Sequence, residues 1–286
     1  MTGKQRRMTI PPWCRALAVA IGLVGALTLA ACDGGAPERP LGLDKFVRNG
    51  PNAVRTVSTS GYTLFLGGGA GAKAGLTWAN GTGGSPATYR DILERVASHG
   101  TQVVASNSPA TGNGLAVADG VGVLRGADGS VGRDFCTSGH SQGGSGAINA
   151  ARIISERGTA DVRCTIPVQP DNRFTASSTG DDIRGQGLIL CGTADGLAPC
   201  NGQTSNGNGL FNQSDVPTCQ ISVVGAGHTG PGSPAGGANA GLYPALVTAG
   251  VEAAIDRDPD AIRSVATRTP DTAQDARFTA VRCKGF

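Results

Sequence analysis

The sequence predicts a single α/β domain, with a mostly parallel central sheet and helices on both faces. Apolar runs of strand length alternate with helical patterns over residues 45–286, which is typical of βαβ units. About 240 residues follow the N-terminal segment, enough for one large core. Glycine is abundant, with 46 residues, and aromatic residues make up only 4%. This composition indicates tight turns and close packing of the elements.

The N-terminus has the pattern of an export signal. Lys4, Arg6 and Arg7 precede an uncharged apolar run over residues 16–29, which predicts a signal peptide over residues 1–31. The run ends in Leu-Ala-Ala-Cys at residues 29–32, a pattern that resembles a bacterial lipobox. We therefore expect cleavage before Cys32 and lipidation of that cysteine. The alternatives are an ordinary secretory signal cleaved near Ala31, or an uncleaved anchoring helix.

Residues 32–44 are expected to form a lipidated flexible tether, followed by the folded domain over residues 45–286. Acyl chains on Cys32 would hold the protein at a membrane surface without spanning it. The predicted location is the bacterial cell envelope, periplasmic or on the outer surface, or the medium if the lipobox is not used. We expect a monomer.

The charge of the mature chain gives no indication of nucleic-acid binding. Residues 1–31 contain four basic and no acidic residues, so 24 − 4 = 20 Lys and Arg face 21 Asp and Glu, a net charge of −1. The slight basic excess of the full chain therefore belongs to the signal.

Six cysteines remain besides Cys14 and Cys32, an even number that favours disulfides in an exported protein. They are Cys136, Cys164, Cys191, Cys200, Cys219 and Cys283. None has CxxC spacing, and the chain has three histidines, so we predict no metal site.

Several strands and helices can be placed along the chain. Strands are predicted at residues 62–66, 101–105, 135–138, 165–168, 188–190 and 221–224. Helices are predicted from the Ser85-Pro86 N-cap to Gly100, over 143–156 and over 240–255.

The pattern Gly139-His140-Ser141-Gln142-Gly143 lies between a predicted strand and a predicted helix. A nucleophilic serine in this context occupies a tight strand-to-helix turn, and the flanking glycines let the backbone pass without side-chain clashes. Such a serine needs a base to take its proton and an acid to orient that base. The sequence therefore predicts an α/β-hydrolase fold with Ser141 as the nucleophile.

His228 is the histidine best placed to act as the base. It lies in a glycine-flanked loop directly after a predicted strand. His140, next to the serine, points in another direction and is expected to be a wall or packing residue. His99 ends a predicted helix, where histidine is commonly structural.

The acid is expected between Ser141 and His228 in the chain. Asp195 follows the strand at 188–190, so all three residues would lie at one edge of the sheet. Asp171 also follows a strand and is the main alternative. Asp181, Asp182 and Asp215 have the pattern of ordinary loop carboxylates.

An oxyanion hole needs two backbone N–H donors. We predict the amide of Gln142 as one donor and that of Gly69, in the Gly-rich loop after the strand at 62–66, as the other. Gly68 is the alternative to Gly69. This loop also matches Gly67-x-Gly69-x-x-Ala72, a dinucleotide pattern, but no helix begins there, so no cofactor is expected.

With these motifs the chain resembles the bacterial polyesterase, lipase and cutinase family of α/β hydrolases, which includes poly(ethylene terephthalate) hydrolases and is related to dienelactone hydrolases. The resemblance covers about residues 50–255. It rests on residues 67–71, 94–100, 139–144, 188–199 and 227–228, which match the family's oxyanion loop, a helix end, the nucleophile turn, the acid loop and the histidine loop. It implies the same triad of Ser141, Asp195 and His228.

The chain departs from this family where the substrate would bind. Gly69 stands where we expect the family's aromatic residue beside the oxyanion loop, and residues 169–172 stand near its binding-cleft tryptophan. An aromatic clamp is therefore expected to be missing, which favours ester hydrolysis in general over polyester hydrolysis.

The six cysteines also depart from the family's common pattern. Cys191 and Cys200 bracket Asp195 closely enough to cross-link the acid loop. Cys164 and Cys219 begin strands, and we expect them to pair with Cys136 and Cys283. The alternative is that one or more cysteines stay as buried thiols.

The predicted activity is that of a serine carboxylic-ester hydrolase, in which Ser141 forms an acyl-enzyme, and the predicted partner is a small or polymeric ester substrate. An acyltransferase or thioesterase on the same triad is the alternative. A binding lipoprotein without catalysis would not need all three residues.

Overall fold

Within the part of the chain that the structure describes, nine strands form one mostly parallel sheet. The computed structural model describes residues 42–69, 71, 73–172, 178–200 and 207–286. The strand order is β1-β2-β4-β3-β5-β6-β7-β8-β9, and the six neighbours from β4 to β8 run parallel. β1, β2 and β9 pair antiparallel with their neighbours. The strands are β1 (Val54–Ser58), β2 (Tyr62–Gly67), β3 (Lys73–Ala79), β4 (Gln102–Ser106), β5 (Val131–His140), β6 (Asp161–Val168), β7 (Gln186–Gly192), β8 (Thr218–Val223) and β9 (Phe278–Lys284).

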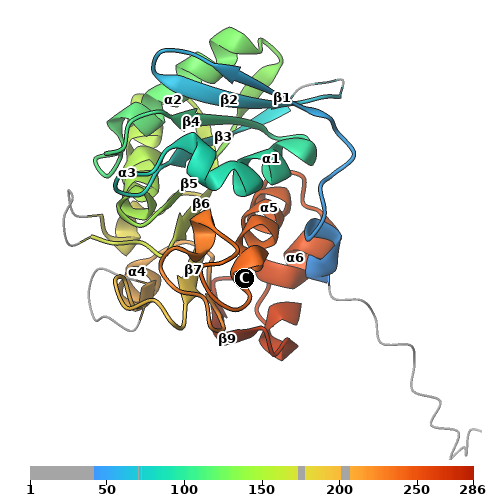
Figure 1. Cartoon of the computed structure of the whole chain (residues 1–286), viewed down its shortest axis with the longest axis vertical. Coiled ribbons are helices and arrows are strands. Elements are labelled where there is room, and N and C mark those ends of the chain that lie inside the picture. Colours follow the sequence, from blue (N-terminus) through green and yellow to red (C-terminus); the bar gives the residue numbers. More distant parts are fainter. Residues whose placement is uncertain (1–41, 70, 72, 173–177, 201–206) are drawn as a thin grey trace, which may run out of the picture. The chain divides into compact units, whose positions relative to one another are not determined.

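Helices cover both faces of this sheet (Figure 1). On one face α1 packs against α5, and α5 against α6; on the other face α2 packs against α3. A short helix, α4, lies beside β7 and β8. The bounds are α1 (Arg90–Ser98), α2 (Leu115–Ala127), α3 (Gln142–Arg157), α4 (Gly207–Gln213), α5 (Tyr243–Ala254) and α6 (Pro259–Val265). The prediction of one α/β domain with helices on both faces is confirmed.

The predicted elements are all present, with changes at their ends. The helix expected from Ser85 to Gly100 is a 3-10 turn (Pro86–Tyr89) followed by α1, and Gly100 has a φ of +120°. The helix expected over residues 240–255 likewise begins as a 3-10 turn (Ala240–Leu242) before α5. β5 begins at Val131, four residues before the expected start.

β3 was not predicted from the sequence, and its glycine explains why. Gly75 lies under the ring of Phe135 on β5, where a Cβ atom would stand 2.2 Å from a ring carbon. A larger residue would therefore displace Phe135. Glycine and alanine have low strand propensity. Gly75, which lets β3 pack against Phe135, therefore also weakens the strand pattern by which β3 could be predicted. α2 was missed for the same kind of reason, because Gly120, Gly122 and Gly126 weaken its helical pattern.

The folded unit begins earlier than the expected boundary at residue 45. A 3-10 helix (Gly42–Phe46) buries Leu43 and Phe46, which are 1% and 0% exposed. Burial of these two large apolar side chains places residues 42–44 in the compact unit Pro40–Phe286, not in a tether. The predicted signal, Cys32 and the rest of the tether lie outside the described residues. Among the residues described, no helix combines the length and apolar character needed to cross a membrane.

Three disulfides cross-link the domain in the expected pairing: Cys136–Cys164, Cys191–Cys200 and Cys219–Cys283. The first and third join facing residues on neighbouring strands, β5 with β6 and β8 with β9. The second closes the loop after β7. Disulfides persist in oxidising compartments, so the three bonds indicate a domain that folds outside the reducing cytosol.

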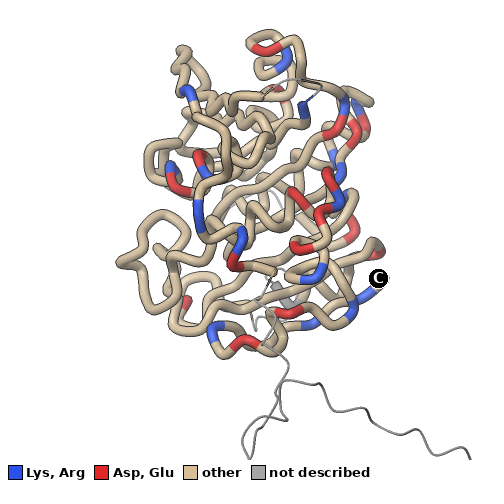
Figure 2. Tube along the Cα trace, turned by 90° about the vertical axis from the view of Figure 1, so that its right-hand side faces the viewer, with Lys and Arg blue, Asp and Glu red and all other residues tan. Residues whose placement is uncertain are grey.

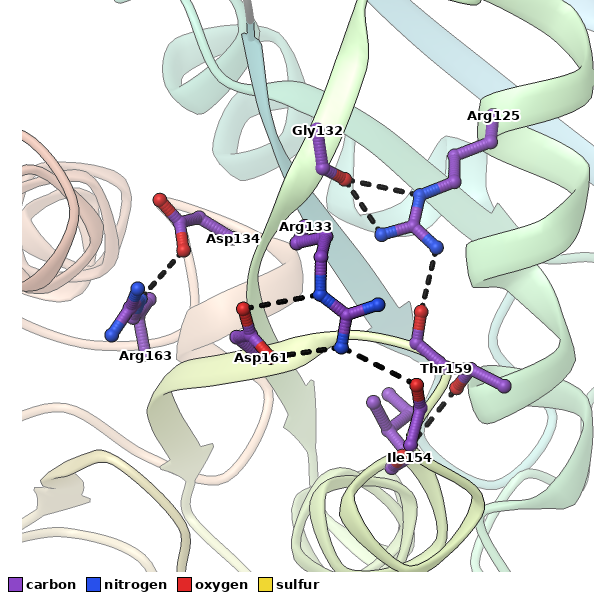
Figure 3. Close-up of polar contacts among 9 residues, drawn as sticks. Arg125, Gly132, Arg133, Asp134, Ile154, Thr159, Asp161 and Arg163 are labelled. Carbon is purple, nitrogen blue, oxygen red and sulfur yellow. Dashed lines mark hydrogen bonds and ion pairs between the residues drawn. The ribbon is translucent and has the colours of Figure 1, made fainter.

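Charged side chains of both signs lie close together along the chain (Figure 2). At the amino ends of β5 and β6, Arg133 pairs with Asp161 and Arg163 with Asp134 (Figure 3). Arg125, near the end of α2, donates to the carbonyl oxygens of Gly132 and Thr159. Exposed ion pairs add about 0 to 1 kcal/mol each to the free energy of unfolding, so this cluster contributes little to stability. Its two ion pairs join β5 to β6, the same strands that the Cys136–Cys164 disulfide connects.

Glu252 is a buried carboxyl group in α5. It is 7% exposed, and its Oε1 has no hydrogen-bond partner among the described residues. Burial, and then the charges of Asp256 and Asp258, raises the pKa of Glu252 to about 8. The folded chain therefore holds the proton over a pH range in which the unfolded chain has released it.

We expect Glu252→Gln to stabilise the protein at alkaline pH. Between the ordinary pKa of 4.5 and the raised value of about 8, the folded state binds more protons than the unfolded state, so stability falls as pH rises. Glutamine removes this loss. Chemical denaturation at about pH 5 and about pH 9 should show the stability gap between variant and wild type growing by about 2 to 4 kcal/mol. Glu94→Gln is the control, at a half-buried carboxyl of α1 that pairs with Arg90. Parallel pH curves for Glu252→Gln and wild type would contradict the expectation.

Candidate active site

Ser141 lies in the turn between the end of β5 and the start of α3, as predicted. Its φ of 58° and ψ of −128° are unusual for a residue with a side chain, and such a backbone costs about 1 to 3 kcal/mol. Glycine is required on both sides, because a Cβ on Gly139 would lie 2.3 Å from the carbonyl oxygen of Gly143, and one on Gly143 2.3 Å from that of Ala79. The Ser141 N–H donates to the carbonyl of Val168 on β6. Neighbouring strands therefore hold the turn from both sides.

His228 bridges Ser141 and Asp195. Its Nε2 is 2.9 Å from Ser141 Oγ, and its Nδ1 is 2.9 Å from Asp195 Oδ2. The three residues follow β5, β7 and β8, which are parallel and end at the same edge of the sheet. The structure therefore brings together the three residues that the sequence singled out. With Nδ1–H donated to the carboxylate, Nε2 is free to accept the serine proton.

Asp195 is held as a carboxylate by several donors. It is 5% exposed, and its Oδ1 accepts the N–H groups of Leu197 and Ala198 at 2.9 and 2.8 Å. Burial opposes ionisation, but the hydrogen bond to His228 and these N–H groups outweigh it and lower the pKa of Asp195. The Cys191–Cys200 disulfide closes the loop that presents this carboxylate.

The other candidate residues have other partners. The N–H of Asp171 donates to the carbonyl of Ser141, and its side chain lines the same cavity, but it is Asp195 that meets His228. His99 Nε2 contacts the carbonyl of Arg48, and His140 Nδ1 contacts the hydroxyl of Tyr89. Both histidines are thus bound within the fold, as expected. Asp182 pairs with Arg152.

Gly69 does not lie near Ser141, so its prediction as an oxyanion donor is wrong. β2 runs antiparallel to β4, so its end lies at the edge of the sheet opposite to the serine. Gly68 and Gly69 border a separate hollow with His99 and Thr101. Gly69 therefore also gives no evidence that an aromatic residue is missing beside the oxyanion loop. The error arises because the sequence does not reveal β3. The strand at 62–66 is then the only predicted strand that can lead into the oxyanion loop.

The loop after β3, residues 80–84, takes that place. It packs against the nucleophile turn, since a Cβ on Gly81 would lie 3.3 Å from the carbonyl oxygen of His140. The N–H of Gly81 donates to Tyr89 and that of Gly83 to Pro109. The N–H of Thr82 has no partner among the described residues. The run Leu76–Ala79 before this loop was the signal that could have identified it.

Two backbone N–H groups are therefore free near Ser141. Thr82 supplies one, and Gln142, the first residue of α3, supplies the other, because the first N–H groups of a helix lack intrahelical partners. Thr82 lines the same cavity as Ser141, and Gln142 follows the serine directly in the chain. The Gln142 prediction is consistent with this arrangement, and Thr82 is a candidate donor in place of Gly69.

A cavity of about 550 Å³ opens at Ser141 and His228. Its wall is made mainly of glycine, threonine and serine, and its larger members are Tyr89, His140 and Leu197. Leu197, from the acid loop, is 56% exposed. The cavity is therefore lined mainly by small residues that carry backbone amides and hydroxyl groups, with one exposed aliphatic side chain, Leu197. Across the described part of the chain, no group of three or more His, Cys, Asp or Glu is arranged to hold a metal ion.

Comparison with models of protein families and with curated proteins found no match for this chain.

We expect loss of the Cys191–Cys200 disulfide to lower the reactivity of Ser141 by more than the loss of stability alone would. The closed loop spans 9 residues, so the paired Cys191→Ala and Cys200→Ala variant should lose about 2 to 3 kcal/mol of stability. Because the loop carries Asp195, labelling of Ser141 by a fluorophosphonate should slow by about tenfold or more.

The matched control removes the disulfide of β8 and β9. Cys219→Ala with Cys283→Ala opens a separation of 64 residues, which the same model weighs at about 4 kcal/mol. This control should lose more stability yet keep its labelling rate well below its melting temperature. Equal labelling rates for both pairs would show that the disulfide does not position Asp195.

Proposed function

We propose that the chain is a serine hydrolase of the α/β-hydrolase fold that cleaves carboxylic ester bonds. One observation carries the proposal: the hydrogen-bonded series Asp195, His228, Ser141, with 2.9 Å at both contacts. The residues occur in the chain order Ser, Asp, His on a strand-to-helix turn and two strand ends, as that fold requires. A hydroxyl, a partly exposed base and a buried acid in this geometry are the components of nucleophilic acyl transfer.

In the proposed reaction Ser141 Oγ attacks the ester carbonyl while His228 Nε2 takes its proton. The carbonyl oxygen becomes an oxyanion, which the N–H groups of Thr82 and Gln142 stabilise. His228 then gives its proton to the departing alcohol, and an acyl-enzyme forms on Ser141. Water, deprotonated by His228, releases the acid. Asp195 keeps the imidazole in the required tautomer and offsets its positive charge.

The oxyanion site accounts for much of the proposed rate enhancement. One donor of this kind contributes on the order of 3 kcal/mol to transition-state stabilisation. Thr82 lies on a loop fixed by Gly81 and Gly83, whose N–H groups are both bound. Its donor is therefore already oriented before substrate arrives.

The resemblance to polyesterases, lipases and cutinases supports the same reaction class. Thr82 and Asp171 both line the cavity. Neither side chain is aromatic, so these two positions supply no aromatic clamp. We therefore propose a general ester substrate before a polyester. The export signal and the lipidation of Cys32 predicted from the sequence, together with three disulfides, support the proposal of a lipid-anchored enzyme of the cell envelope.

We expect Ser141→Ala to abolish hydrolysis of p-nitrophenyl esters of short acids, with a loss of at least about 10³-fold in kcat. The thermal midpoint should change little or rise, since alanine keeps the turn and removes only a hydroxyl. Ser155→Ala, on the exposed side of the same helix, is the control and should keep full activity. Wild-type rates in Ser141→Ala would refute the assignment.

A competition with an added alcohol separates hydrolase from acyltransferase. For a hydrolase, release of p-nitrophenol should match release of free acid even with methanol present at moderate concentration. An acyltransferase would instead give mainly the new ester, and a thioesterase would prefer acyl thioesters by kcat/KM. Because the cavity offers few large apolar side chains against which a long acyl chain could pack, we expect acetyl and butyryl esters to exceed long-chain esters in kcat/KM.

A further inference from the structure

Three buried side chains bind the loops that carry the proposed site, and two of them, Tyr89 and His140, also line the cavity. Tyr89, in the 3-10 turn before α1, is 3% exposed. Its hydroxyl accepts the N–H of Gly81 at 3.0 Å and lies 2.9 Å from His140 Nδ1. One phenol oxygen thus connects the loop of the Thr82 donor to the residue beside Ser141.

His140 is a buried neighbour of the proposed base. Its Nδ1 shares a hydrogen bond with the Tyr89 hydroxyl, which also accepts the N–H of Gly81. Burial, followed by repulsion from His228, lowers the pKa of His140 to about 3. The ring is therefore neutral near neutral pH. It lies 4.8 Å from the ring of His228, centroid to centroid.

Gln169 is the third buried side chain of the set. It follows β6 with a φ of +43°, a backbone conformation that residues other than glycine rarely adopt. Oε1 of Gln169 and Nε2 of His140 are both buried, and neither has a hydrogen-bond partner among the described residues. The Gln169 side chain raises the pKa of His140, against the larger lowering by burial.

The amide nitrogen of Gln169 reaches the remaining two loops. Nε2 donates to the carbonyl of Gly227 at 3.0 Å and to the hydroxyl of Tyr243 at 2.8 Å. Tyr243 in turn donates to the carbonyl of Cys191 at 2.9 Å. Space for this amide depends on Gly192, where a Cβ would lie 2.4 Å from Nε2.

We infer that Tyr89, His140 and Gln169 are positioning residues that hold the Thr82 donor, Ser141 and His228 in one geometry. This inference rests on the proposed function. None of the three meets the reacting atoms in the proposed mechanism. They act by fixing three backbone segments: Gly81 before Thr82, His140 before Ser141, and Gly227 before His228. The neutral His140 ring also places no second positive charge beside His228 when that residue holds the serine proton.

Hydrogen bonds in a core can also serve stability alone, and the test must separate the two roles. Positioning predicts a fall in kcat with little change in KM, because a shift of the donor or base affects the transition state more than the bound ester. A purely structural role predicts a lower melting temperature with kcat unchanged. Tyr62, on β2 and away from the site, offers a comparison: it is half-buried, and its hydroxyl donates to the carbonyl of Ala116 on α2 at 2.9 Å.

The experiment compares Tyr89→Phe with Tyr62→Phe in the full exported protein. Both variants lose one tyrosine hydroxyl. We expect kcat for p-nitrophenyl butyrate to fall about 10- to 100-fold in Tyr89→Phe, with KM within about twofold and fluorophosphonate labelling of Ser141 slowed by a similar factor. Tyr62→Phe should keep wild-type kcat at a comparable loss of melting temperature.

Wild-type kcat in Tyr89→Phe, with a lowered melting temperature, would overturn the inference and leave the proposed function standing. If Tyr89→Phe does not fold, Gln169→Met, which keeps the side-chain length and removes the amide, must show the same loss of kcat at constant KM. Unchanged kcat there would equally overturn the inference. If the wild type itself hydrolyses no ester, the proposed function fails, and the labelling rates of Ser141 alone decide the positioning role.

Discussion

The geometry of the site depends on a backbone that bends sharply at Ser141. This residue has a positive φ, and the turn persists because β3 and β6 enclose it: the carbonyls of Ala79 and Asn80 lie against Gly143, and Val168 accepts the Ser141 N–H. The same close approach sets the loop with Thr82 beside the serine. A single constraint on backbone packing therefore determines both where the nucleophile points and where the unpaired amides lie.

Much of the site was predictable because its signals are local. The glycines around Ser141 report a turn that only small residues permit, and Asp195 and His228 each follow an apolar run that became a strand. Parallel strands end at one edge of a sheet, so the order of these runs was enough to bring the three residues together. The Cys191–Cys200 pair was predictable because the two cysteines bracket the acid loop at a separation of 9 residues. The partner of Cys219 was less evident, because β9, which carries Cys283, was not predicted from the sequence.

The errors arose where packing overrides local preference. β3 contains Gly75 because Phe135 needs its space, and no feature of the sequence announces that need. Once β3 was missed, the glycine loop after β2 took its place, and Gly69 was assigned to the wrong edge of the sheet. The role of Gln169 was equally hidden, because its partners come from segments distant in the chain.

The three disulfides are distributed unevenly over the sheet. All six cysteines lie between Cys136 and Cys283, on β5 and the strands after it, whereas β1 to β4 carry none. Under thermal or mechanical stress the amino-terminal strands are therefore the part free to separate first. That part supplies Thr82 and Tyr89, while Ser141, Asp195 and His228 belong to the cross-linked part. Partial opening would leave the three side chains and the Gln142 amide assembled but would remove the Thr82 amide, so the proposed activity would be lost before the cross-linked part unfolds.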